Sequence, residues 1–206
     1  MSILVTGGAG YIGSHVVKEL LEKGEDVIIL DSLETGHKEA VMGGRLYVGD
    51  LRDKEFMTSI FQKNEIEGII HFAANSLVGE SMKNPYKYYE NNVYGTLCLI
   101  KQMLNHRVDK IVFSSTAATY GNPDAIPIKE DSPTNPTNVY GETKLVMENM
   151  FKWFAKIHNI NYISLRYFNA AGADESGKIG ELHEPETHLI PNILRAVLNK
   201  ESVKIF

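Results

Sequence analysis

The sequence predicts an α/β fold built on a doubly wound parallel β-sheet. Short runs rich in Val, Ile and Leu alternate with longer segments whose apolar residues recur at helical spacing. This alternation is typical of parallel βαβ units with right-handed crossovers. The short runs are continuously apolar, as in strands that helices cover on both faces. A length of 206 residues, with 43% hydrophobic and 23% charged residues, fits a globular protein of this class.

The N-terminal half is expected to alternate strands and helices without interruption. Each predicted strand is a short apolar run, and each predicted helix has apolar residues three or four positions apart. Gly24 ends the first helix, and Asp31 ends the second strand. The expected strands are 3–6, 27–30, 46–48 and 68–72, and the expected helices are 12–23 and 54–62.

The C-terminal half continues this pattern with longer helices. Pro85 opens a helical stretch to about Asn105, because proline is favoured at the first helical position. A Pro-rich loop precedes the next long helix. The expected strands are 110–114 and 162–167, and the expected helices are 85–105, 139–158 and 189–199. The last residues, 203–206, resemble the beginning of another strand.

Three glycines, Gly7, Gly10 and Gly13, lie between the first strand and the first helix. In such a turn the first glycine permits a tight bend, and the second lets the backbone approach a pyrophosphate. The third glycine lets the helix pack closely against the strand. The helix N-terminus then offers unpaired N–H groups and a positive dipole end to the phosphates. The sequence therefore predicts a dinucleotide site in a Rossmann-type domain.

Two carboxylates at strand ends bear on the choice of dinucleotide. Asp31 ends the second strand and is placed to accept hydrogen bonds from the adenosine ribose hydroxyls. Its charge would repel a 2′-phosphate, so the sequence favours NAD over NADP. Asp50 follows the third strand and is either an adenine contact or only a turn former.

Tyr140 and Lys144 are one helical turn apart, so both side chains lie on the same helix face. One Tyr-x-x-x-Lys match is close to the roughly 0.8 that chance gives for this composition. Its position downstream of the nucleotide-binding unit therefore carries the inference. A nearby ammonium favours the phenolate, which can take a proton from a substrate hydroxyl. Ser114 and Thr116 end the fifth strand, where a hydroxyl can hold the reacting oxygen.

Composition argues against several other classes of protein. A net charge of -5 without a basic stripe excludes a typical nucleic-acid partner. No apolar run approaches the ~18 residues that span a membrane, and the N-terminus does not resemble a signal peptide. The single cysteine, Cys98, cannot form an internal disulfide, which fits a cytoplasmic location.

The segment Glu181–His188 contains several potential metal ligands. Their spacing is irregular, and Pro185 interrupts the segment, so a solvated loop that closes on substrate is the favoured interpretation. No metal is expected from the sequence.

These motifs resemble those of the extended short-chain dehydrogenase/reductase superfamily. The matching segments are the glycine motif, Asp31, Ser114-Ser115-Thr116 and Tyr140-Gly141-Glu142-Thr143-Lys144. Finer matches, which extend over essentially the whole chain, are similar to those of UDP-glucose (UDP-galactose) 4-epimerases. These finer matches are Ile70–Ala74, Val78–Ser81, Tyr88–Val93 and Leu165–Gly172.

The resemblance implies specific roles for these residues. Tyr140 would be the general base and acid, Lys144 would bind the nicotinamide ribose, and Thr116 would hold the sugar hydroxyl. The expected substrate-binding set is Thr116, Asn169, His188 and Leu189. The expected NAD-binding set is Gly7, Gly10, Tyr11, Ile12, Gly13, Asp31, Ser32, Asp50, Leu51, Phe72, Ala73, Ala74, Asn91, Ser114, Tyr140, Lys144 and Phe168.

The activity that the resemblance implies is the interconversion of UDP-galactose and UDP-glucose. C4 of the UDP-hexose would be oxidised by tightly bound NAD, and hydride would return to the other face of the sugar. A UDP-glucuronate epimerase or decarboxylase and an NAD-binding module without turnover remain alternatives. A sugar-nucleotide dehydratase is disfavoured, because Ala117 and Ala118 follow Thr116 where that chemistry needs an acid/base pair.

The resemblance also implies how the chain is organised. Residues 1–168 are expected to form the NAD-binding domain, and residues 169–206 the start of a small substrate domain that is truncated at Phe206. A homodimer is expected, in which the helices at 85–105 and 139–158 of two subunits form a four-helix bundle.

Overall fold

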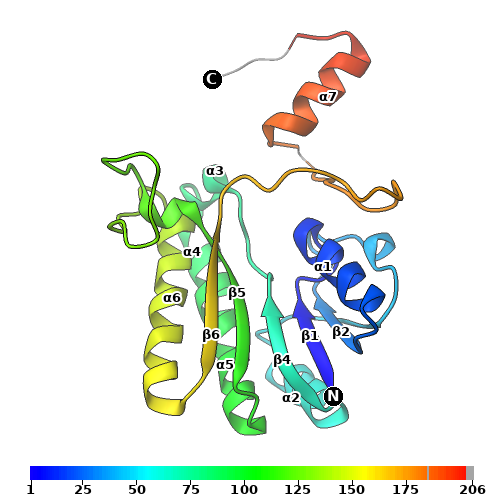
Figure 1. The fold of residues 1–206 in the computed structure, drawn as a ribbon, viewed down its shortest axis with the longest axis vertical. Coiled ribbons are helices and arrows are strands. Elements are labelled where there is room, and N and C mark those ends of the chain that lie inside the picture. The colour runs from blue at the N-terminus through cyan, green and yellow to red at the C-terminus, as the bar shows by residue number, and fades with distance from the viewer. Residues whose placement is uncertain (185, 203–206) are drawn as a thin grey trace.

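The computed structural model describes residues 1–184 and 186–202 and is built on one parallel sheet (Figure 1). Its six strands lie in the order β3-β2-β1-β4-β5-β6, which confirms the expected doubly wound α/β fold. The strands are β1 (Ser2–Thr6), β2 (Val27–Asp31), β3 (Arg45–Val48), β4 (Ile66–His71), β5 (Lys110–Thr116) and β6 (Asn161–Tyr167).

The helices lie between the strands, as the sequence pattern predicts. The α-helices are α1 (Tyr11–Glu22), α2 (Lys54–Lys63), α3 (Val78–Ser81), α4 (Pro85–Tyr88), α5 (Gly95–His106), α6 (Val139–His158) and α7 (Leu189–Asn199). Two short 3₁₀ turns, η1 (Lys38–Ala40) and η3 (Ala117–Tyr120), and a π-helical stretch, η2 (Tyr89–Tyr94), complete the secondary structure of the described residues.

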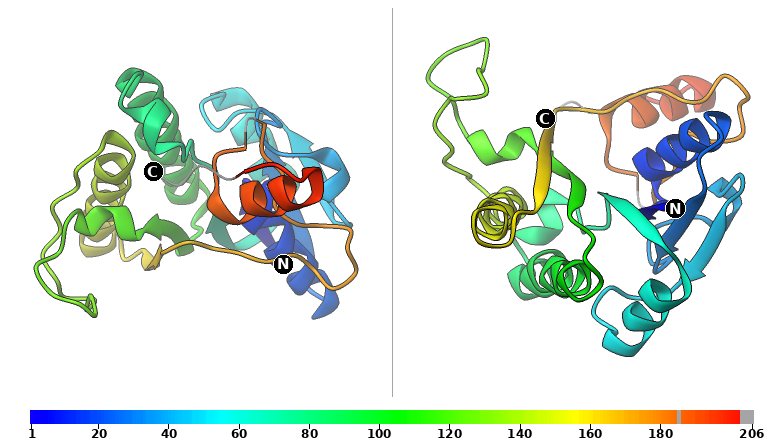
Figure 2. Two further views of the ribbon diagram at one scale, coloured as in Figure 1. Left: turned by 90° about the horizontal axis from the view of Figure 1, so that it is seen from above. Right: turned by 60° about the horizontal axis from the view of Figure 1, so that its bottom comes forward.

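The two faces of the sheet carry cores of unequal size. On one face, apolar side chains of α2, α5 and α6 pack on β1, β4 and β5 in a core that includes Met57, Leu99 and Phe151. On the other face, Val17 of α1 packs against Val5 and neighbouring strand residues in a smaller core. Figure 2 shows α5 and α6 side by side, on the opposite side of the sheet from α1.

The expectation that helices cover both faces fails at β6. Tyr162 faces the large core. Successive side chains of a strand point to opposite faces of the sheet. Ile163 and Leu165 on that opposite face are 57% and 40% exposed. Within residues 1–184 and 186–202, this part of the sheet is therefore covered on one side only.

The sheet topology fixes where a ligand can bind. The strand order reverses between β1 and β4, and ligands of open parallel sheets bind beyond the carboxyl ends of the strands at this switch point. The segment after β6 crosses above these strand ends and leads to α7 (Figure 1). The glycine turn after β1 and the residues that end β5 lie at this same edge.

The predicted element boundaries agree closely with the observed ones. The long helices at 139–158 and 189–199 match α6 and α7 at both ends, while β4 begins two residues earlier and β5 ends two residues later than predicted. The expected helix at 85–105 corresponds to α4, η2 and α5 in succession. The strand expected at 203–206 lies outside the described residues.

Candidate cofactor and active site

The glycine turn between β1 and α1 has no room for side chains at two of its predicted positions. A Cβ on Gly13 would lie 2.1 Å from the carbonyl oxygen of Gly7. Gly7 has a φ of +71°, and a Cβ there would lie 2.6 Å from the backbone nitrogen of Ala73. The turn therefore needs glycine both for its conformation and for the close approach of β1, α1 and the segment after β4.

The start of helix α1 differs from the starts of α2 and α6. Gly10 is the N-cap, no side chain among the described residues caps it, and the first turn has no acidic residue. By contrast, the side chains of Asp53 and Asn138 cap α2 and α6. An uncapped helix start after a glycine turn leaves N–H donors and a positive dipole end available to a pyrophosphate.

Asp31 is held rigidly at the end of β2. Its buried carboxylate accepts a 2.9 Å hydrogen bond from the backbone N–H of Ala9 and another of 2.9 Å from the N–H of Leu33. The bond from Ala9 joins the second strand to the glycine turn, and the bond from Leu33 closes the turn that follows the strand. They leave acceptor capacity on the two carboxylate oxygens, as the expected contact with a ribose requires.

Asp50 lies at the same edge but is engaged by a cation. The Arg52 guanidinium contacts both oxygens of its carboxylate, at 2.9 Å from Nε to Oδ1 and 2.5 Å from Nη2 to Oδ2. Hydrogen bonding from Arg52 holds the pKa of Asp50 below its usual range. Arg52 also reaches Glu90 on η2 at 3.1 Å, so Asp50 has a structural role in addition to lining the cleft.

Sequence reasoning missed Asn75, which completes the wall of this cleft. Its backbone N–H and C=O bond to the side-chain amide of the buried Asn92 at 2.8 and 3.0 Å. Its own side-chain nitrogen is buried and has no hydrogen-bond partner in the structure. A buried amide donor without a partner in a ligand cleft indicates a ligand acceptor. The sequence Ala73-Ala74-Asn75 does not indicate a side-chain amide without a hydrogen-bond partner, because the lack of a partner depends on contacts with η2.

The cleft gathers most of the residues that the sequence predicted for the cofactor. Its lining includes ten of them: Gly7, Gly10, Asp31, Ser32, Asp50, Leu51, Phe72, Ala73, Ala74 and Asn91. Its lining also includes Leu30, Glu34, Thr35, Gly36, Gly49 and Asn75. Of the other predicted cofactor residues, Tyr11, Ile12 and Gly13 form the first turn of α1. The glycine turn, Asp31 and the free amide of Asn75 together fit a dinucleotide of the NAD type.

The three predicted catalytic side chains come together at the carboxyl end of β5. Thr116 ends β5, close enough to Tyr140 that its hydroxyl acts to lower the pKa of the phenol. Lys144, one turn further along α6, donates from Nζ to the carbonyl oxygen of Ser114 at 2.8 Å. The same Nζ lies 5.9 Å from the centre of the Tyr140 ring. The structure therefore brings together Ser114, Thr116, Tyr140 and Lys144.

The charge balance of this group differs from the expectation that Lys144 lowers the pKa of the phenol. Burial raises the pKa of Tyr140 above its ordinary value, and the bond to Thr116 only partly offsets this. Burial also lowers the pKa of Lys144 to about 7. Burial removes water from the phenolate of Tyr140 and from the ammonium group of Lys144, and so disfavours both charged forms. Neither group has an ion pair among the described residues that would offset this effect.

An ion pair missed by sequence reasoning supports the end of β5. The Arg166 guanidinium on β6 contacts Glu148 on α6 at 2.7 Å and 3.0 Å. Glu148 also accepts a hydrogen bond from the hydroxyl of Ser115, and Arg166 lies over the Tyr120 ring. This arrangement links β5, β6 and α6 directly beside Thr116 and Tyr140.

The chain after β6 is tied to α1 at several points. The Tyr11 hydroxyl donates to the carbonyl oxygen of Gly172 at 2.7 Å, and Lys18 pairs with Asp174 at 3.1 Å. Phe168, which the sequence placed near the nicotinamide, is 64% exposed, and Asn169 is also exposed. In the structure, both of these predicted residues are therefore exposed to solvent.

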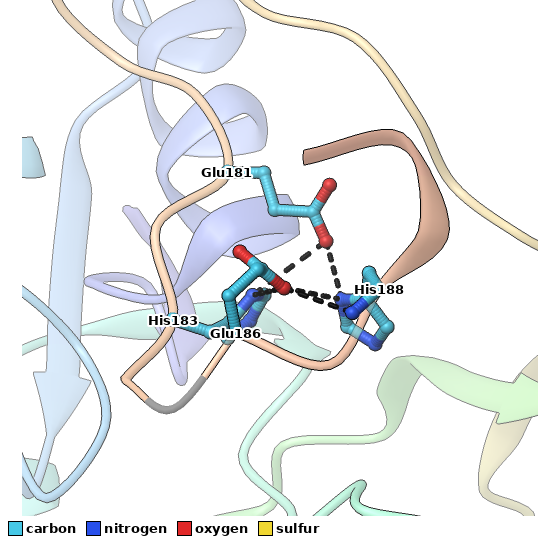
Figure 3. A group of neighbouring side chains, drawn as sticks. All are labelled: Glu181, His183, Glu186 and His188. Carbon is cyan, nitrogen blue, oxygen red and sulfur yellow. Dashed lines mark hydrogen bonds and ion pairs between the residues drawn. The ribbon is translucent and has the colours of Figure 1, made fainter. Parts of the chain in front are cut away.

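His188 and Leu189, predicted to contact the nucleotide end of a substrate, lie where the chain enters α7. Leu189 is exposed, whereas the Nδ1 atom of His188 contacts the carboxylate of Glu181. His188 belongs to a cluster with Glu181, His183 and Glu186, whose ligand atoms all lie within 4.8 Å of one another (Figure 3). The expected solvated loop is therefore a compact group of potential ligands.

His71 is buried, and both of its ring nitrogens are bonded. Nδ1 lies 2.6 Å from the Thr6 hydroxyl, and Nε2 lies 2.8 Å from the Thr96 hydroxyl. Burial, with a smaller contribution from Lys144, lowers the pKa of His71 to about 3. The histidine is thus neutral and structural.

No described helix combines the length and the hydrophobicity that crossing a membrane requires.

Known proteins are similar to this chain over almost its whole length. The UDP-glucose 4-epimerase of Halalkalibacterium halodurans is 60% identical over the whole chain, which spans 62% of that relative. The NAD complex of the Brucella ovis UDP-glucose 4-epimerase has a TM-score of 0.94 at 45% identity, covering 97% of this chain and 61% of its own. The Thermotoga maritima UDP-glucose 4-epimerase with UDP-glucose has a TM-score of 0.90 at 34% identity. The match covers 100% of this chain and 66% of that one.

The chain thus spans less than two thirds of the length of these relatives, although they match it almost from end to end. The sequence profile of one family also matches it over residues 3–206. With its parallel sheet, its glycine turn and its Tyr-Lys pair, the chain belongs to the NAD dependent epimerase/dehydratase family.

Proposed function

We propose that the cleft at the carboxyl edge of the sheet binds NAD. The glycine turn and the uncapped start of α1 suit the pyrophosphate, and the carboxylate of Asp31 suits an unphosphorylated ribose. The free amide of Asn75 supplies a further donor. Bound NAD supplies the hydride acceptor and donor of the reaction, and a related enzyme from Brucella ovis has been solved with NAD.

We propose further that this protein interconverts UDP-galactose and UDP-glucose. The observation that carries this proposal is the grouping of Tyr140, Thr116 and Lys144 beside the cofactor cleft. Relatives that are 60% and 54% identical over the whole chain are UDP-glucose 4-epimerases. We assign residues 1–168 to the NAD-binding domain and residues 169–206 to the part that contacts the sugar nucleotide.

Each side chain of the group has a distinct task. The phenol oxygen of Tyr140 takes the proton from the 4-hydroxyl of the hexose and later returns it. The Thr116 hydroxyl holds that oxygen in place. Lys144 keeps N–H donors beyond the one directed at Ser114, and these bind the ribose hydroxyls of the nicotinamide. A cationic Lys144 close to Tyr140 also favours the phenolate once the cofactor covers the site.

The variant Tyr140→Phe tests the assignment of the base. Turnover of UDP-galactose should fall at least about 100-fold, while NAD remains bound as measured by native mass spectrometry. Tyr162→Phe, on β6, is the matched control and should keep full turnover. Persistent turnover in Tyr140→Phe would show that another group is the base. NAD binding without turnover in the wild-type chain would instead support a binding module.

Substrate contacts are proposed for the segment after β6. Asn169, His188 and Leu189 lie between β6 and the first residue of α7, beyond the carboxyl ends of the strands. Leu189 and Asn169 offer exposed apolar and amide groups, which suit a uracil ring and a diphosphate. The exposed Phe168 ring would be covered by the nicotinamide. Alanine variants at Asn169 should raise KM for UDP-galactose more than they lower kcat.

We also propose that two copies associate through the helical face formed by α4, η2, α5 and α6. This face carries exposed apolar side chains, among them Tyr86, Leu97, Trp153 and Ile157, and large exposed apolar patches mark interaction sites. Trp153→Glu should convert a dimer to a monomer in sedimentation velocity experiments. Leu198→Glu, on the exposed face of α7, is the matched control. A monomeric wild-type chain would contradict the proposal.

A further inference from the structure

We propose that the segment before α7 forms a binding site for one divalent transition metal ion, best matched by Zn²⁺. Its ligands are Glu181, His183, Glu186 and His188 (Figure 3). The proposal concerns a site outside the cofactor cleft, and it does not depend on the proposed function.

Three pairs of the donor atoms are spaced much as a tetrahedral ion requires. The Nδ1 atom of His183 lies 3.5 Å from Oε1 of Glu181 and 3.7 Å from Oε1 of Glu186. The Nδ1 atom of His188 lies 3.8 Å from Oε1 of Glu186. Zinc bonds of about 2.0–2.2 Å place tetrahedral ligands about 3.3–3.6 Å apart. These pairs need only small movements to bind an ion, whereas Nδ1 of His188 and Oε1 of Glu181, which are in direct contact, would have to move apart.

Two of the donors are buried without a hydrogen-bond partner. Nδ1 of His183 and Oε2 of Glu186 both lack one in the structure. The side chain of Glu186 is only 1% exposed, although Oε1 accepts the backbone N–H groups of Thr187 and His188 at 2.9 Å each. A buried polar atom without a partner is costly, and a metal ion would satisfy Nδ1 of His183. On Glu186 the ion would bind Oε1, the oxygen that lies nearest to both histidines.

The charges of the cluster also call for a cation. The carboxylates of Glu181 and Glu186 are 9% and 1% exposed, and buried carboxylates are normally paired or coordinate metals. Arg195 is the nearest guanidinium, and it approaches Glu186 only to 4.0 Å. A divalent ion would neutralise both carboxylates.

The donor set selects the class of metal and its role. Two imidazole nitrogens and two carboxylate oxygens suit zinc and neighbouring transition metals, whereas Ca²⁺ and Mg²⁺ prefer six or more oxygen ligands. Four protein ligands leave a tetrahedral ion with no open position, which is typical of structural sites. The metal would therefore fasten the segment after β6 rather than take part in the reaction.

The location of the cluster indicates which parts of the chain a bound ion would hold together. The carbonyl oxygen of Leu182, between two ligands, lies 3.1 Å from Nε2 of His37. The same segment is tied to α1 through Tyr11 and Lys18. Coordination would fix the entry into α7 against the glycine turn. It would use Nδ1 of His188 and leave Nε2 of that ring available to a nucleotide.

Metal content measured on the untagged 206-residue chain tests the proposal. The protein is dialysed against ZnSO₄, then against metal-free buffer, and zinc is counted by mass spectrometry of the digested sample. One zinc per chain is expected. His183→Ala and Glu186→Gln should each lower the content at least tenfold, with the far-ultraviolet circular dichroism spectrum unchanged. The controls His158→Ala and Cys98→Ser should retain one zinc.

A second measurement keeps the test decisive if a variant unfolds. Co²⁺ added to the wild-type chain should give the intense visible absorption of a tetrahedral nitrogen and oxygen site, and Zn²⁺ should abolish it. A wild-type chain that retains less than a tenth of an equivalent of zinc would overturn the proposal. So would zinc content that falls in the His158 or Cys98 controls but not in the cluster variants.

Discussion

The ammonium group of Lys144 donates a 2.8 Å hydrogen bond to the carbonyl oxygen of Ser114. This bond joins α6 to the end of β5 at the point where the proposed reaction takes place. The lysine side chain is buried, and burial lowers its pKa to about 7. The site therefore places a charged group in an apolar setting before any ligand binds, which makes the stability of the cofactor-free chain depend on pH.

The stability of the cofactor-free chain should rise between pH 7 and pH 9. The folded chain releases the Lys144 proton near pH 7, whereas the unfolded chain holds it until about pH 10.4. The unfolded state thus binds more protons across this window, so the free energy of unfolding rises with pH, by up to a few kcal/mol. Urea unfolding at constant ionic strength measures this rise.

Lys144→Met should flatten this pH dependence, because the variant has no proton to release. Lys152→Met, at an exposed position of the same helix, is the matched control and should keep the wild-type rise. An equal rise in the Lys144 and Lys152 variants would mean that another group titrates in this window.

His71 should make the chain lose stability as the pH falls from 6.5 to 3. Its pKa is lowered to about 3 in the folded chain, so the unfolded chain binds the extra proton in this range and is favoured by acid. His71→Asn should unfold with a pH dependence that is smaller by up to one proton. His158→Asn, at the exposed end of α6, should match the wild-type slope. Identical slopes for the two variants would contradict the assignment to His71.

Much of the fold follows from local features of the sequence. Helix α6 begins and ends as predicted because Asn138 caps its first turn and Asn159 adopts the left-handed conformation at its end. The glycine turn was identified from three residues, because Gly7 has a φ of +71° and a Cβ on Gly13 would meet the backbone of Gly7 and Gly8. Signals of this kind act within a few residues, and a single sequence contains them.

Other features depend on contacts that no local pattern records. Glu148 and Arg166 pair only because α6 and β6 pack side by side, and the free amide of Asn75 depends on Asn92 in the π-helical η2. The four-donor cluster forms from ligands at irregular spacing, because an irregular loop brings them together. The pKa of Tyr140 was expected to fall, but burial has the larger effect.

Gly13→Ala should destabilise the chain and weaken NAD binding together. The added Cβ would lie 2.1 Å from the backbone carbonyl oxygen of Gly7, which cannot move without displacing β1 and α1. Overpacking of this kind costs about 3 kcal/mol. Gly79→Ala in α3, where nothing lies within 4 Å of the new Cβ, is the matched control. Equal melting temperatures for the two variants would refute the close packing inferred here.

Asn75→Ala should weaken NAD binding about fivefold to tenfold, the usual effect of one lost hydrogen bond. Asn75 holds η2 through its backbone, which bonds to the Asn92 side chain. Its own side-chain nitrogen has no partner among residues 1–184 and 186–202, so its removal breaks no bond within this part of the chain. The free energy of unfolding without NAD should therefore change little, or rise slightly as a buried unsatisfied donor disappears.

Isothermal titration with NAD and urea unfolding of the same samples separate these two effects. Asn105→Ala, at an exposed position of α5, is the control for a general effect of the substitution. If Asn75→Ala lowers stability but leaves the NAD affinity unchanged, the amide serves the protein and not the ligand. If it lowers affinity alone, the orphaned donor identifies a cofactor contact that lies outside the glycine motif and the Tyr-Lys pair.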